Sequence, residues 1–142
     1  MPSPPDARLP DVRRIGSLAQ RRAALAEAEL LRAQRASEAA RQALADARQA
    51  LADCIVDVAE RRAALRAACQ ADPGDSPMLR RWRQADQAQI DRIDVARRLV
   101  ADRERERDAA ELALGEALDR QRALARRREK YTLIEAELRE DG

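Results

Sequence analysis

Charged side chains are the main candidates for chemistry in this chain, and the chemistry they suggest is ionic recognition. Lysine and arginine together number 28, aspartate and glutamate number 26, and histidine is absent. Without histidine, the chain lacks the commonest acid–base group and metal ligand. The acids are plentiful, but a rod of two helices offers no concave pocket in which to shift their pKa values. We therefore expect no enzymatic activity and no catalytic residue.

The two cysteines suggest neither a disulfide nor a metal site. Cys54 and Cys69 lie on one predicted helix, about 22 Å apart along its axis, which is too far to bridge. Two isolated cysteines do not make a zinc pattern, and no glycine-rich phosphate loop is present. We expect reduced thiols, no metal and no cofactor.

Basic residues form two clusters that lie far apart in the sequence. They are Arg13, Arg14, Arg21 and Arg22 in the first cluster, and Arg126, Arg127, Arg128 and Lys130 in the second. Apolar residues accompany both clusters, namely Leu18 and Leu25 in the first and Tyr131, Ile134 and Leu138 in the second. Cations beside apolar side chains are suited to binding an acidic protein surface. The clusters form one site only if the fold brings them together.

The segment Ala71-Asp-Pro-Gly-Asp-Ser-Pro77 predicts how this happens, because it is the one strong break between two long helical patterns. Pro73 disfavours helical geometry at Asp72, and Gly74 can adopt a positive φ. Ser76 and Pro77 suit the N-cap and first position of a second helix, with Asp75 adding favourable charge beside it. Two long helices joined by a short turn should fold back as an antiparallel hairpin, with arms of about 90 Å.

Seven-residue spacing in both arms predicts that the hairpin is a coiled coil. In the first arm one set of seam positions is Leu30, Ser37, Leu44, Leu51, Val58 and Leu65, and the set three residues later is Ala33, Ala40, Ala47, Cys54, Arg61 and Ala68. In the second arm the seam runs from Ile93 to Leu138 in steps of three and four. Large positions alternating with small ones favour close approach of the helices. Before residue 30 the bulky residues Ile15, Leu18, Leu25 and Leu31 leave this phase, so the seam should shift or end there.

We predict an all-α protein with a disordered proline-rich lead at 1–10 and a single antiparallel coiled-coil hairpin at 11–142, with helices at 11–71 and 77–140. A turn centred near Gly74 pairs residues whose numbers sum to about 149, by the geometry of a hairpin. The two basic clusters then meet at the open end, where their like charges should repel. No stretch approaches the roughly 20 apolar residues of a membrane span, and the N-terminus lacks the order of a signal peptide, which favours a cytosolic protein.

Met78, Leu79 and Trp82 form a second candidate contact, at the tip of the hairpin. They can pack beneath the turn against Leu65 and Ala68, or they can contact a partner. Base stacking needs several aromatic side chains on one platform, which a single tryptophan does not supply.

The whole pattern resembles the central-stalk proteins of type III secretion, the FliJ-like flagellar and YscO/HrpO-like injectisome proteins. The local features are Arg-Arg-Arg-Glu-Lys-Tyr (126–131) followed by Ile134-Glu-Ala-Glu-Leu-Arg-Glu140, within a hairpin of this size. The proline-rich lead and the near absence of lysine, with Lys130 as the single one, are not features that mark this family.

The resemblance implies a non-catalytic protein at the cytoplasmic face of a secretion apparatus, in which the open end enters a hexameric secretion ATPase. The rest of the hairpin would reach an export-gate membrane protein, and secretion chaperones are further implied partners. On this reading the ATPase-binding residues are Arg13, Arg14, Leu18, Arg21, Arg22, Arg126, Arg127, Arg128, Lys130, Tyr131, Ile134 and Leu138. Met78, Leu79 and Trp82 are then the possible tip contact.

Three other functions fit parts of the pattern. A cytosolic scaffolding coiled coil would use the same heptads, and a dimer would bury the surplus apolar residues. A nucleic-acid-binding arm is disfavoured, because the acids nearly balance the cations. A membrane-surface rod needs a bulky apolar face, and the apolar stripe here is largely alanine, so we expect no nucleic acid and no membrane insertion.

Overall fold

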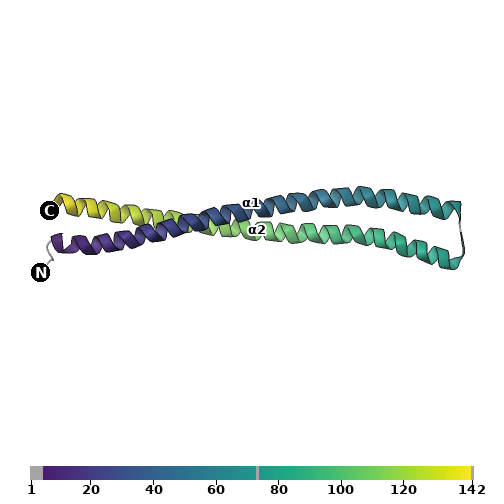
Figure 1. Cartoon of the computed structure of the whole chain (residues 1–142), viewed down its shortest axis with the longest axis horizontal. Helices are drawn as coiled ribbons and strands as arrows, with labels where there is room; N and C mark the ends of the chain where they lie inside the picture. Colours follow the sequence, from purple (N-terminus) through teal and green to yellow (C-terminus); the bar gives the residue numbers. More distant parts are fainter. Residues whose placement is uncertain (1–4, 73, 142) are drawn as a thin grey trace. The chain divides into compact units, whose positions relative to one another are not determined.

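The computed structural model describes residues 5–72 and 74–141, which form two helices. They are α1 (Pro5–Ala71) and α2 (Ser76–Asp141), and they pack against each other as an antiparallel hairpin (Figure 1). The predicted fold class is therefore confirmed. Pro73 and the first four residues of the predicted lead lie outside the described residues.

The start of α1 differs from the sequence prediction. The helix begins at Pro5 rather than near Asp11, and it contains Pro10. A proline at the first helical position loses no hydrogen bond, because the first N–H groups of a helix have no intrahelical partner. Pro10 lies far enough in to leave one carbonyl without its usual donor, yet the helix continues through it. The second helix agrees with the prediction to within one residue at each end.

The turn between the helices depends on Gly74 and Asp75. Gly74 has a φ of 59°, the left-handed conformation that was predicted for it. Asp75 is the N-cap of α2, because its Oδ1 accepts a hydrogen bond of 3.1 Å from the Met78 N–H. The prediction of Ser76 as the cap is therefore wrong by one residue. A carboxylate in the cap position both accepts this bond and complements the positive end of the helix dipole.

The hairpin divides into two compact units, which we describe separately. The turn unit comprises residues 39–108, and the open-end unit comprises residues up to 38 together with those from 109 onward. Within each unit, two cross-helix ion pairs join residues whose numbers sum to 148 or 149, as predicted. These pairs are Arg62–Asp86 and Arg92–Asp57 in the turn unit, and Arg13–Glu135 and Arg120–Glu29 in the open-end unit. Two other cross-helix pairs, Arg48–Glu104 and Arg128–Glu27, depart from the rule, with sums of 152 and 155.

The core of the turn unit follows the predicted heptad over most of its length. Leu44, Ala47 and Val58 are buried, with 2%, 5% and 2% of their surface exposed. Near the turn the predicted seam residues Arg61 and Ala68 are exposed, and the residues that follow each of them, Arg62 and Cys69, are half-buried instead. This correction has a local cause at Arg62, whose guanidinium forms two hydrogen bonds with Asp86, of 2.8 and 3.2 Å.

The core of the open-end unit consists of small side chains. Ala19, Ala23 and Ala26 are buried on α1, at spacings of four and three that continue the heptad. The expectation that the seam shifts or ends around residues 25–30 is therefore wrong. The bulky Ile15, Leu18, Leu25 and Leu31 lie off the seam and are exposed. Small residues on α1 can face bulkier side chains of α2. Gly16 is an example, because a Cβ added there would lie 3.8 Å from the Cβ of Tyr131.

Candidate protein-binding site

A groove of about 280 Å³ opens between α1 and α2 in the open-end unit. Its lining is Ile15, Leu18, Ala19 and Arg22 from α1, and Leu124, Arg127, Lys130 and Tyr131 from α2. The two helices thus bring together five residues that the sequence selected from clusters more than a hundred positions apart. We call this surface the open-end groove.

The three cations of the open-end groove have no salt-bridge partner within the part of the chain that the structure describes. They are Arg22, Arg127 and Lys130. Their apolar neighbours Ile15 and Leu18 have 44% and 50% of their surface exposed. Uncompensated positive charge beside accessible apolar surface is the combination that binds an acidic segment carrying an apolar side chain.

Two of the predicted site arginines serve the hairpin instead. Arg13 pairs with Glu135 at 3.4 Å, and Arg128 pairs with Glu27 at 3.6 Å. Arg128 is half-buried on the seam of α2. These cross-helix pairs offset part of the like-charge repulsion that the sequence predicted for this end.

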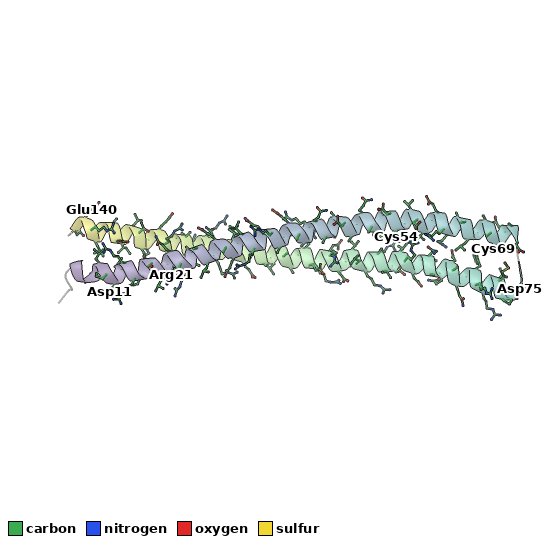
Figure 2. The ribbon with its side chains drawn as sticks, viewed as in Figure 1. Asp11, Arg21, Cys54, Cys69, Asp75 and Glu140 are labelled. Carbon is green, nitrogen blue, oxygen red and sulfur yellow. The ribbon has the colours of Figure 1, made fainter. Side chains whose placement is uncertain are left out.

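The remaining predicted arginines point away from the groove. Arg14, Arg21 and Arg126 are exposed, and each lies midway between successive seam positions, on the outer side of its helix. Figure 2 shows Arg21 extending from α1 on the side away from α2. These three residues can add to the positive field of this end, but they cannot line the groove.

The apolar residues of the C-terminal turns differ in how far they are buried. Ile134 and Leu138 are half-buried toward the helix interface, whereas Leu133 has 65% of its surface exposed. Sequence reasoning did not select Ile15 and Leu124 for the site. The signal for Ile15 was its position one turn before Leu18, which places both on one side of α1.

A second hollow lies at the tip, in the turn unit. It has a volume of about 340 Å³ and is lined by Met78, Leu79 and Trp82 together with Leu65 and Ala68, among others. The candidate tip residues thus border one hollow beneath the turn, and Met78 and Leu79 remain 48% and 40% exposed. The Trp82 Nε1–H is buried without an acceptor in the described part of the chain.

The ionisable groups with shifted pKa values form cross-helix ion pairs in the turn unit. Hydrogen bonds from Arg62 lower the pKa of Asp86. A hydrogen bond of 2.7 Å from Arg92, with a further contribution from Arg61, lowers the pKa of Asp57. Among the described residues, no group of three or more acids and cysteines is arranged to hold a metal ion, and neither helix has a stretch apolar enough to cross a membrane.

Comparison of the chain with protein-family models, curated proteins and solved structures finds no match. The class that the fold itself defines is an antiparallel, coiled-coil-like helical hairpin.

Proposed function

We propose that this chain is a non-catalytic central stalk of a type III secretion system, whose open end engages the hexameric secretion ATPase. The observation that carries the proposal is the open-end groove, where unpaired cations and exposed apolar side chains meet at one end of a hairpin. The resemblance of the sequence to the stalk family adds the identity of the partner. On this proposal the protein acts at the cytoplasmic face of the apparatus.

The tip gives the proposed stalk a second contact. Exposed Met78 and Leu79 beside Trp82 form the apolar surface that would meet the export-gate membrane protein. Secretion chaperones are further partners of the proposed stalk. A protein that couples two machines needs separate surfaces for them, and the two hollows lie in different units of the hairpin.

The ATPase contact can be tested by charge reversal inside the groove. We expect Arg127→Glu combined with Lys130→Glu to weaken binding to the secretion ATPase about tenfold or more, because unpaired cations at an interface set much of the attraction. The remaining affinity should depend less on salt. Isothermal titration with the purified ATPase across a salt series measures both effects.

Arg126→Glu is the matched control, since Arg126 adjoins Arg127 but lies on the outer side of α2. It should change the affinity less than reversal of Arg127 alone. Equal losses from the two single variants would show that only the general field matters, and unchanged binding of the double variant would refute the proposed contact.

A scaffolding coiled coil is the second candidate function. It is favoured by one observation, a long groove in the turn unit that a further helix pair would cover. The two functions differ in their partners, because only the stalk requires binding to the ATPase.

A further inference from the structure

Three adjoining hollows run along one side of the turn unit. Their volumes are about 330, 480 and 310 Å³ in order toward the turn. The first two share Leu99, and the second and third are linked through Ala88 and Ala85, one helical turn apart on α2. The hollows therefore form one continuous surface, which we call the turn-unit groove.

The two walls of the turn-unit groove differ in side-chain size. Its α1 wall is made largely of small residues, with Ala43, Ala47, Ala50 and Cys54 at one end. On the α2 wall Val95 and Leu99 project, with 62% and 40% of their surface exposed. In the observed register Leu99 lies level with Ala50, and Val95 lies level with Cys54. One side of the unit thus carries both a ridge and a matching row of small residues.

We propose that a second copy of this chain covers the turn-unit groove, so that two hairpins pair through a twofold axis parallel to the helices of the turn unit. This rotation places α2 of one copy against α1 of the other at the same level. Leu99 and Val95 of each copy then pack over Ala47, Ala50 and Cys54 of its partner. Neighbouring helices across the interface run antiparallel, as they do in stable four-helix bundles.

The charges that line the groove suit the same arrangement. Asp46 has only Gln42 as a hydrogen-bond partner among the described residues, at 2.9 Å. Arg103 lies level with it on the α2 wall of the same hollow, and its guanidinium also bonds the carboxylate of Glu106 on its own helix, at 2.8 and 3.0 Å. The twofold rotation therefore brings Arg103 of each copy to Asp46 of the other, which adds two opposite-charge contacts to the interface.

The size of the groove matches that of a stable interface. Its lining extends from residue 43 to residue 68 of α1, about 37 Å at 1.5 Å per residue. A face about two helix diameters wide over this length covers roughly 750 Å², close to the ~800 Å² that each partner contributes to a standard interface.

The pairing goes beyond the proposed stalk function and does not depend on it. It specifies a second copy of this chain as the helix pair that the scaffolding function places over the same groove. It uses residues of the turn unit and none of those that line the open-end groove. Binding to the ATPase and pairing of two copies can therefore be measured, and can fail, separately.

Sedimentation equilibrium of the full chain tests the pairing. We expect the unmodified chain to dimerise at micromolar concentration, and Leu99→Glu to raise the dimer dissociation constant at least tenfold, because it places a charge in the apolar contact. Leu112→Glu is the matched control, since Leu112 is a 67% exposed leucine of the open-end unit, and it should leave the constant unchanged. A monomeric unmodified chain at ~100 µM, or equal effects of the two variants, would overturn the proposal.

A charge exchange between copies provides the second measurement. Asp46→Arg and Arg103→Asp should each weaken their own homodimer, since each places like charges across the interface. An equimolar mixture should restore the dimer, because the heterodimer has two opposite-charge pairs while the charges within each chain stay the same. Helix content by circular dichroism verifies that both variants fold. Failure of the mixture to dimerise better than either variant alone would contradict the predicted contact.

Discussion

At the residue scale, both the backbone conformation of Gly74 and the space around it disfavour any side chain at this position. Its φ of 59° is disfavoured for any residue with a side chain. A Cβ at this position would also press against Met78, with 3.0 Å to its Cβ, 3.1 Å to its Cγ and a still closer approach to its Sδ. Gly74 therefore lets the chain reverse while Met78 lines the hollow beside the turn.

Replacing Gly74 by alanine should destabilise the hairpin by about 1–2 kcal/mol, from left-handed backbone strain alone. Crowding against Met78 should add to this loss. Urea unfolding followed by circular dichroism measures the change. In Gly115→Ala, a helical position with no heavy atom within 4 Å of the new Cβ, the same measurement should show a gain of about 1 kcal/mol from helix propensity. Equal shifts for the two variants would show that the turn conformation is not required.

Ser37 is the one buried polar residue of the described core, with 2% of its surface exposed and no partner for its hydroxyl. Burial of an unpaired hydroxyl costs roughly 1–3 kcal/mol. We expect Ser37→Ala to stabilise the chain by about 1 kcal/mol in the same urea assay, since alanine also favours helix. Ser17→Ala, at an exposed position, should change stability less. A destabilised Ser37→Ala variant would mean that the hydroxyl has a partner in solution.

At the scale of the elements, an ion pair joins α1 and α2 near the turn, beside the half-buried Leu65 and Trp82. The Arg62 and Asp86 side chains are 33% and 17% exposed, and two hydrogen bonds join them. This pair occupies the place where the heptad predicted Arg61 on the seam. A repeat pattern cannot indicate that a neighbouring arginine will turn inward to meet an acid on the other helix.

This ion pair predicts how stability depends on pH. The pKa of Asp86 is lowered in the folded chain by hydrogen bonds from Arg62, so folding favours its ionised form. The stabilisation is therefore complete above the ordinary aspartate pKa of about 3.9 and is lost as the pH falls through the lowered value. Asp86→Asn should lower the urea midpoint at pH 7 and should show a smaller further loss on acidification than the unmodified chain.

Asp53→Asn is the control for this experiment, because Asp53 is exposed and its hydrogen-bond partner is the neutral side chain of Gln49. Its urea midpoint at pH 7 should stay close to that of the unmodified chain. An acid-induced loss that is the same with and without Asp86 would contradict the role assigned to the pair.

At the scale of the whole molecule, the hairpin consists of two units that use different side chains for contact. The turn unit buries Leu44 and Val58, whereas the open-end unit buries mainly alanines of α1. Alanine burial removes little apolar area from water, so each unit obtains only modest stability from its own core. Surfaces that remain open on such a thin core are suited to partners, and the two grooves give each unit one.

The fold and the pairing of the helices could be predicted from the sequence, whereas only some of the residues that line the site could. Heptad spacing, the break at 71–77 and the sum rule for facing residues were enough for the hairpin. The clusters near the two chain ends were also identified in advance. The division of these clusters between the groove and the helix interface was not predicted. Arg22, Arg127 and Lys130 line the groove, while Arg13 and Arg128 pair across the helices.

The sequence by itself determined what is local and periodic: where the helices break, that Gly74 reverses the chain, and that two long helices meet along one seam. These features follow from backbone sterics and from the repeat of 3.6 residues per turn. Only the tertiary structure decided which charged side chains stay unpaired and which apolar side chains stay exposed. The reason is that a cation becomes free or paired, and a leucine covered or exposed, according to the residue that the other helix places opposite it. Arg127 and Arg128 are adjacent in the sequence, yet one lines the groove and the other pairs with Glu27.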